Sequence, residues 1–198
     1  MSTQAVASAK PETRGYAWTT RDIIIVAVLS AIVGVANTGL SFVFQMALAG
    51  AGAIGSAFFQ GMFGWGRSLV YPLVRKPGAI LAVGVLGTLV AVLLGNPAGF
   101  YTLGWGILQG LAAEGVLAFV RWKKQGPWVN FIFSAVNAQF GTLWTWYLYG
   151  WSKTMDQYWL SIPLTLVSGG VSAGLLGWYL YKLLESSGLL RVALGRDS

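Results

Sequence analysis

The stretch RKPGAILAVGVLGTLVAVLLGNPAGFYTLGWGILQGLAAEGVLAFVRWKK, residues 75–124, decides the fold of this chain. It holds two apolar segments of helical length, separated by the uncharged turn Gly95-Asn96-Pro97. Positive charge brackets the two outer ends, at Arg75-Lys76 and at Arg121-Trp122-Lys123-Lys124. Apolar segments with Lys and Arg only at their outer ends are typical of membrane helices. The stretch therefore predicts a pair of membrane helices that starts and ends on the same side.

The composition extends this interpretation to the whole chain. Of 198 residues, 56% are hydrophobic and 10% are charged, and the mean hydropathy is +0.64. Soluble domains carry about 25% charged residues. The 27 glycines are about twice the usual share near 7%, which suits helices that pack closely in a membrane. The chain has no cysteine and no histidine, so thiol chemistry, Cys/His metal sites and histidine catalysis are excluded, and we predict no catalytic or metal site.

Six apolar segments follow a polar start. Each has roughly 16 to 25 residues, which at about 1.5 Å per residue spans about 30 Å of hydrocarbon, the third only just. Lipid offers the backbone no partners, so the segments must be helical. We predict an all-α integral membrane protein with a disordered cytoplasmic tail (1–20), a membrane domain (21–185) and a cytoplasmic C-terminal tail (186–198). The predicted transmembrane helices are 23–45, 54–74, 79–94, 101–120, 129–146 and 160–184.

The distribution of Lys and Arg predicts the orientation. With the N-terminus inside, the outer side holds Lys153 alone, while Arg67 lies within a segment. Because positive charge collects on the cytoplasmic side, both termini are predicted to be cytoplasmic. The net charge of +7 lies at segment ends, so it does not indicate nucleic-acid binding. The inner side collects Lys10, Arg14, Arg21, Arg75, Lys76, Arg121, Lys123, Lys124, Lys182, Arg191 and Arg196.

Two charged residues lie deep inside the predicted membrane segments, away from the segment ends. Arg67 is about 20 Å from the outer start of its segment, and Glu114 is about 18 Å from the outer start of its own. Because they share a depth, we predict a structural ion pair between them. A proton relay and a ligand contact are the alternatives.

Amides and indoles gather in the outer half of the predicted bundle. A planar heteroaromatic ligand needs rings to stack on and amides to read its edge, so this pattern predicts a pocket for such a ligand. Hydrogen bonding between helices is the alternative for each amide. The predicted substrate-binding residues are Gln60, Trp105, Gln109, Asn137, Trp144 and Tyr147.

Two further features concern partners and access. Ala27 and Ala31 form a ridge of small residues at four-residue spacing, which we interpret as a site for docking a partner helix. The outer connection 46–53 is uncharged and rich in Gly and Ala, and is either a lid or a linker. The outer loop 150–159 holds Lys153 and Asp156 among aromatic residues and is the expected entrance.

The motifs around residues 75–124 resemble the YkoE family, the thiamine or hydroxymethylpyrimidine S components of energy-coupling factor (ECF) transporters. The resemblance covers most of the chain and is densest in the middle. It implies a six-helix S-component fold, an outward-facing vitamin site, and partners that comprise a transmembrane T subunit and two ATPase subunits. The Ala27/Ala31 ridge is similar to the motif by which S components meet their T subunit. The motifs are Trp18-Thr19-Thr20-Arg21-Asp22-Ile23, Arg75-Lys76-Pro77-Gly78-Ala79, Leu94-Gly95-Asn96-Pro97-Ala98-Gly99, Gln109-Gly110-Leu111-Ala112-Ala113-Glu114 and Arg121-Trp122-Lys123.

Alternatives remain both for the ligand and for the class of protein. Thiamine is a cation, yet the outer halves of the second and third segments have no acid, with Ala57, Gly84 and Ala91 at the positions of interest. The neutral pyrimidine or another small heterocycle is therefore an alternative ligand, and a membrane assembly protein without any ligand is an alternative class. No phosphate-binding loop of the Gly-x-x-x-x-Gly-Lys-Ser/Thr type is present, so no cofactor is expected and ATP is left to the partner subunits.

Overall fold

The computed structural model describes residues 16–149 and 155–188, with the backbone alone at 47, 48, 51, 53 and 155–158. The first half of this part contains α1 (Thr20–Gln60), the 3₁₀ turn η1 (Gly61–Gly64), α2 (Trp65–Leu73) and α3 (Ala79–Leu93). The second half contains η2 (Gly99–Tyr101), α4 (Thr102–Phe119), α5 (Pro127–Tyr149), α6 (Met155–Ser168), the π-helical turn η4 (Gly169–Leu175) and α7 (Leu176–Ser186). The predicted all-α fold is confirmed.

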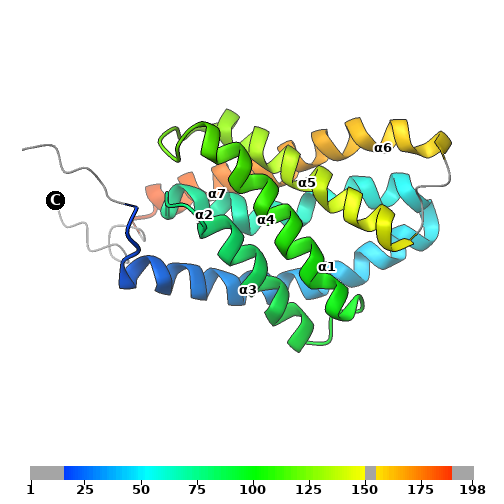
Figure 1. The fold of residues 1–198 in the computed structure, drawn as a ribbon, viewed down its shortest axis with the longest axis horizontal. Helices are drawn as coiled ribbons and strands as arrows, with labels where there is room; N and C mark the ends of the chain where they lie inside the picture. The colour runs from blue at the N-terminus through cyan, green and yellow to red at the C-terminus, as the bar shows by residue number, and fades with distance from the viewer. Residues whose placement is uncertain (1–15, 150–154, 189–198) are drawn as a thin grey trace, which may run out of the picture.

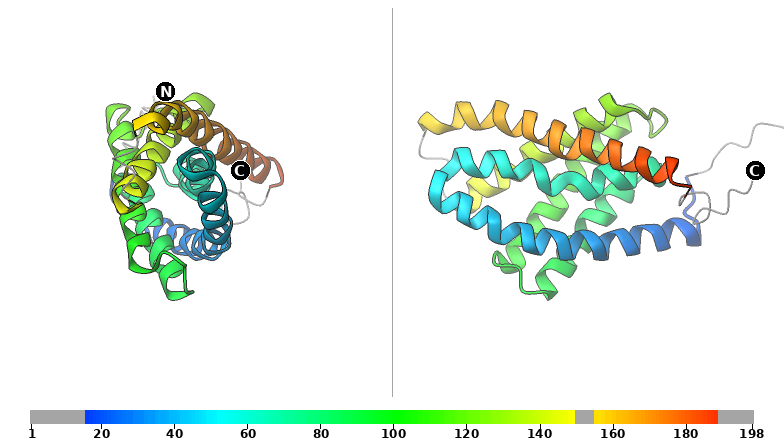
Figure 2. Two further views of the ribbon diagram at one scale, coloured as in Figure 1. Left: turned by 90° about the vertical axis from the view of Figure 1, so that its right-hand side faces the viewer. Right: turned by 180° about the vertical axis from the view of Figure 1, so that it is seen from behind.

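The first two predicted segments form a hairpin whose turn lies inside α1. The helix assignment runs unbroken through the 46–53 connection, but Gly52 has φ 55° and ψ −139°, and the chain reverses there (Figure 2). An L-residue rarely adopts a positive φ, so glycine suits this turn. Beyond Gly52, the second arm of α1 continues through η1 into α2. The role of 46–53 as a lid stays a prediction.

The helices lie roughly along one long axis, with α3 and α4 crossing the others as a pair (Figure 1). The two ends of the described chain, at the start of α1 and the end of α7, lie at the same end of the molecule (Figures 1 and 2). Between α3 and α4 the backbones touch, since a Cβ added at Gly106 would lie 2.7 Å from the carbonyl oxygen of Gly84. Such close approach requires glycine.

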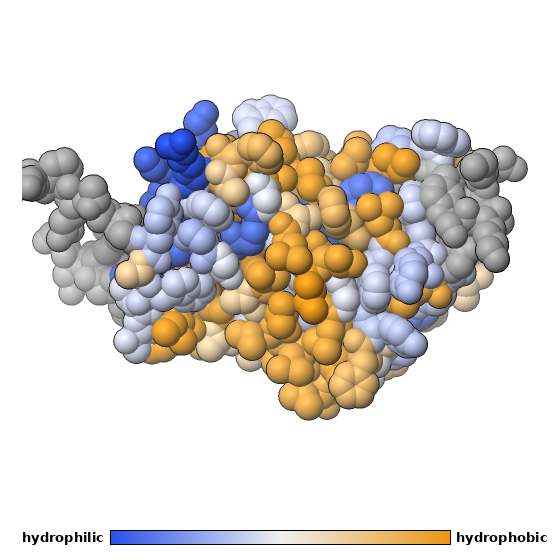
Figure 3. Space-filling model, in the orientation of Figure 1, coloured by the Kyte–Doolittle hydropathy of each residue, from blue (hydrophilic) through white to orange (hydrophobic). Residues whose placement is uncertain are grey.

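The surface is apolar over the middle of the molecule. Figure 3 shows hydrophobic side chains gathered there and hydrophilic ones towards the end where the chain starts. Phe119 is 92% exposed and Leu93 is 77% exposed, as expected of side chains that face lipid. By length and composition, Thr20–Met46, Gly99–Phe119 and Trp159–Ser186 are long and apolar enough to cross a membrane, and Ala79–Leu93 is a shorter apolar helix.

The predicted ion pair between Arg67 and Glu114 is wrong. Glu114 Oε1 accepts hydrogen bonds from the backbone N–H groups of Ile80, at 3.0 Å, and Leu81, at 3.4 Å, and its Oε2 accepts one from Trp122 Nε1 at 2.9 Å. These backbone donors belong to the first turn of α3, whose N-cap is a glycine without a capping side chain. Glu114 therefore caps α3 from α4, where a carboxylate also interacts favourably with the helix dipole.

Candidate ligand-binding site

A cavity lies between α1, η1, α2, α3 and α4. Its empty volume is about 510 Å³, counting the part open to solvent. Aromatic rings, uncharged polar groups and one guanidinium line its walls. The lining side chains that carry these groups are Asn37, Ser41, Phe44, Gln45, Gln60, Phe63, Arg67, Thr88, Asn96, Thr102, Trp105 and Gln109.

Asn96 fixes one wall of the cavity. It follows Gly95, whose φ of 79° turns the chain after α3, and it is 5% exposed. Its Nδ2 donates to Ser41 Oγ at 2.7 Å, and its Oδ1 accepts from the N–H of Ala98 at 3.0 Å and from Thr102 Oγ1 at 3.1 Å. The turn between α3 and α4 is thereby tied to α1.

Arg67 lies on another wall of the cavity. This side chain is 4% exposed, and its Nη1 donates to Gln109 Oε1 at 2.7 Å. The guanidinium lies against Gly84, since a Cβ added there would be 2.9 Å from Arg67 Nε. A charged hydrogen bond of this kind is short and strong, and it joins α2 to α4.

A second set of polar contacts brings α5 to the cavity. Trp105 Nε1 donates to both Gly141 O and Thr145 Oγ1, each at 3.1 Å. Thr145 Oγ1 in turn lies 3.4 Å from Gln60 Oε1. A Cβ added at Gly141 would be 1.9 Å from Gln109 Nε2 and 2.3 Å from Gln60 Nε2, so glycine leaves room for both amides. Three of the predicted binding residues, Gln60, Trp105 and Gln109, therefore line one cavity.

The other three predicted binding residues do not line it. Asn137 is buried deeper, and its Nδ2 would be 2.8 Å from a Cβ at Gly64. Trp144 packs edge-on against Trp105, with ring centroids 6.5 Å apart, and its Nε1 donates to the carbonyl oxygen of Tyr101 at 3.1 Å. Tyr147 stacks on Trp144 at 5.3 Å and is 74% exposed. A direct ligand contact by these residues stays a prediction.

Several lining residues were missed in the sequence analysis. Asn37 and Ser41 lie one helical turn apart on α1, and both are buried. Two polar residues at four-residue spacing in a highly apolar run are a signal that was available. Thr88 and Thr102 carry no such signal, because a hydroxyl can satisfy itself on the backbone of its own helix. Thr88 does so by donating to Gly84 O at 2.9 Å.

The predicted docking ridge lies on the outside of the bundle. Ala27 and Ala31 are both exposed on α1, near the end of the molecule where the chain starts. Of the predicted entrance loop, residues 150–154 lie outside the described part, including Lys153, and the side chain of Asp156 is not described either.

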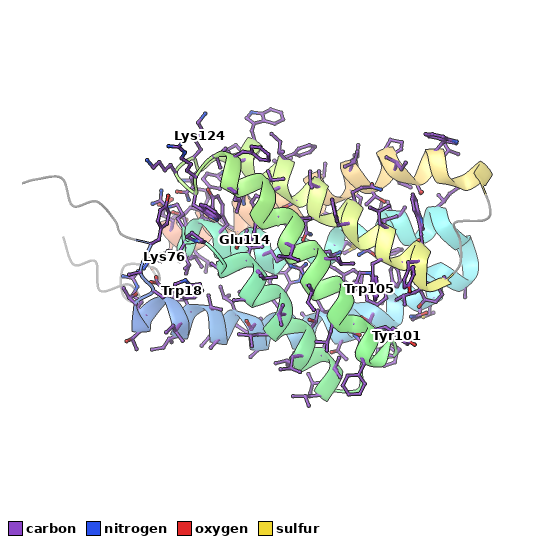
Figure 4. The ribbon with its side chains drawn as sticks, in the orientation of Figure 1. Trp18, Lys76, Tyr101, Trp105, Glu114 and Lys124 are labelled. Atoms are coloured by element: carbon purple, nitrogen blue, oxygen red, sulfur yellow. The ribbon has the colours of Figure 1, made fainter. Side chains whose placement is uncertain are left out.

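The cavity lies away from the basic end of the bundle. Figure 4 shows Tyr101 and Trp105 towards one end, and Trp18, Lys76 and Lys124 at the other. The ends of the described chain lie with the lysines. Basic residues thus mark one end of the molecule, and the cavity, whose described lining carries one charged side chain, lies in the other half.

Comparisons with known proteins agree on a transport subunit. Residues 21–141 match the model of a family described as the permease component of an ABC-type cobalt transport system. A relative from Bacillus subtilis (strain 168), named "Putative HMP/thiamine permease protein YkoE", is 31% identical over 185 residues, covering 91% of this chain and 92% of the relative. A solved structure described as the crystal structure of an S-component of an ECF transporter matches with a TM-score of 0.85 and 28% identity, over 91% of this chain and 93% of that one.

Proposed function

Because this chain belongs to the YkoE family of ECF-transporter S components, we propose that it captures thiamine or its hydroxymethylpyrimidine precursor in the cavity and delivers it across the cell membrane. The relatives are transport subunits and not enzymes. The observation that carries the proposal is the convergence of Gln60, Trp105 and Gln109 on one cavity. An indole offers a face for a flat ring, and amides offer donors and acceptors to its edge.

The proposal places the cavity near the extracellular face of a multi-pass membrane protein. Lys76 and Lys124 lie at the end of the molecule where the described chain starts and finishes, and Trp105 lies towards the opposite end (Figure 4). Lys and Arg favour the cytoplasmic side of a membrane. With both termini cytoplasmic, the cavity faces outward, and Gln45, which lines it, directly precedes the 46–53 connection.

The family model is named for cobalt and the relative for HMP or thiamine. The chemistry of the cavity favours an organic ligand. Cobalt is bound in proteins by imidazole, thiolate or carboxylate groups. The chain has no His and no Cys, and the described residues contain no group of three or more His, Cys, Asp or Glu that can hold a metal ion. The walls instead present amides, hydroxyls and rings, which suit a pyrimidine.

Energy for transport comes from partners in this proposal. The chain has no nucleotide-binding loop, so two ATPase subunits hydrolyse ATP and a transmembrane T subunit passes the motion on. The T subunit docks on the exposed Ala27/Ala31 ridge of α1, where small side chains permit close helix contact.

Thermal unfolding of the detergent-solubilised chain against a panel of vitamins tests the proposal. A ligand present at 100 times its Kd stabilises the folded state by about 2.7 kcal/mol, which raises the Tm by several degrees. We expect a shift with hydroxymethylpyrimidine or thiamine, and none with vitamins that lack the pyrimidine. No shift with either compound, together with no heat of binding in calorimetry, would refute the proposal and favour an assembly protein without a ligand.

A further inference from the structure

The charge on the cavity walls is not what a cationic ligand needs. Of the described side chains that line the cavity, Arg67 is charged and none is acidic. Its hydrogen-bond partner Gln109 is a neutral amide, and both side chains are at least 96% buried. Arg67 therefore presents its positive charge to the cavity without a carboxylate beside it.

Two acids among the described side chains are engaged elsewhere. Both carboxylate oxygens of Glu114 are used by the first turn of α3 and by Trp122. Asp22 is paired with Lys76 at the basic end of the bundle, and its Oδ2 also accepts from the Thr19 backbone at 2.8 Å. Neither carboxylate is placed to neutralise Arg67.

We infer that Arg67 makes this cavity selective for uncharged ligands, so that neutral hydroxymethylpyrimidine is preferred over thiamine, whose thiazolium carries a fixed positive charge. The inference rests on the proposed function and narrows it to one substrate class. Its physical basis is that like charges repel more strongly where water is partly excluded than they do in bulk water.

Calorimetric binding to the unaltered full-length chain in lipid nanodiscs tests the inference. Three ligands separate charge from size: hydroxymethylpyrimidine, thiamine, and a thiamine analogue whose thiazolium is replaced by an uncharged thiophene of the same shape. We expect the two neutral compounds to bind at least about tenfold more tightly than thiamine, as like-charge repulsion in a partly desolvated site predicts. Thiamine binding as tightly as its neutral analogue, or more tightly, would overturn the inference and leave the proposed function standing. Binding of none of the three would remove both.

Substitution of the partner amide tests the role of Arg67 itself. Gln109→Glu puts a carboxylate against the guanidinium and should reduce the preference for the neutral analogue by about tenfold or reverse it. Gln139→Glu is the matched control, because Gln139 is partly buried on α5 and does not line the cavity. An unchanged preference in a Gln109→Glu protein whose Tm matches that of the control would contradict the assignment to Arg67.

Discussion

At the scale of single residues, the side chains of the cavity also hold the helices together. Trp105 reaches the cavity with its ring, while its Nε1 is held by Gly141 O and Thr145 Oγ1 on α5. An indole fixed in this way is pre-organised, so a ligand that stacks on it has no side-chain entropy to remove. Trp144 lies behind it and supports its edge.

This arrangement predicts different effects for the two tryptophans. Trp105→Ala removes a ring that lines the cavity, and we expect it to weaken ligand binding by about tenfold or more. Trp144→Ala removes only the support, so it should weaken binding less, and Trp144→Phe should restore most of the loss. Calorimetry on purified proteins measures both effects. Trp128→Ala is the control, since Trp128 is 74% exposed and lies outside the cavity lining. Equal ligand affinity of the Trp105→Ala variant and the unaltered protein would show that this cavity is not the binding site.

Three of the six predicted binding residues, Gln60, Trp105 and Gln109, line the cavity. Gln60 and Gln109 were identified because an amide in an apolar segment is costly unless it faces the interior of the bundle. Trp144 and Tyr147 lie outside the cavity lining, and an aromatic residue in the outer half of a membrane helix has three suitable environments: a pocket, the helix packing and the lipid interface. Composition and spacing do not distinguish among these.

At the scale of elements, the equal membrane depth of two residues did not predict a contact between them. Arg67 and Glu114 were paired by counting about 1.5 Å per residue along straight helices. The segment before Arg67 contains the 3₁₀ turn η1, whose rise is about 2.0 Å per residue, so the count is already in error. Depth also says nothing of direction around the helix, and Glu114 faces the start of α3. The six segments themselves were predictable, because lipid requires long apolar helices.

The 3₁₀ turn η1 packs backbone to backbone against α6 and the π-helical turn η4. A Cβ added at Gly61 would lie 2.4 Å from the carbonyl carbon of Ser168 and 2.5 Å from the backbone nitrogen of Gly169. These are backbone atoms, which cannot move aside as a flexible side chain does. The two non-α turns therefore bring the second and sixth predicted membrane segments together.

Gly61→Ala should consequently destabilise the fold. Overpacking of a well-packed core costs about 1–3 kcal/mol, so we expect a Tm several degrees lower and weaker ligand binding, because Gln60 precedes the contact and lines the cavity. Gly39→Ala is the matched control on α1, where an added Cβ meets nothing within 4 Å and alanine favours the helix. Thermal unfolding of the two variants in one detergent decides the matter, and equal Tm values would show that the contact is loose.

At the scale of the whole molecule, the cavity and the basic residues lie in different halves of the bundle. The cavity lies in one half, and the basic residues, the capping by Glu114 and the ends of the described chain lie in the other (Figure 4). The Ala27/Ala31 ridge belongs to this second half, on the exposed side of α1. An exposed surface outside the cavity lining can bind a partner without touching the ligand.

Ala27→Leu and Ala31→Leu should therefore uncouple binding from transport. A leucine on the ridge holds a partner helix away from the α1 backbone, so we expect co-purification of the T subunit to fall by about tenfold or more while ligand affinity stays unchanged. Ala36→Leu is the matched control: Ala36 is also exposed on α1, and nine residues beyond Ala27 it lies about half a turn around the helix axis. Co-expression with the T and ATPase subunits, followed by purification through a tag on this chain and an uptake assay, measures the effect. Full recovery of the complex with both ridge variants would move the docking surface elsewhere, because an interface that tolerates two added isobutyl groups does not depend on close backbone approach.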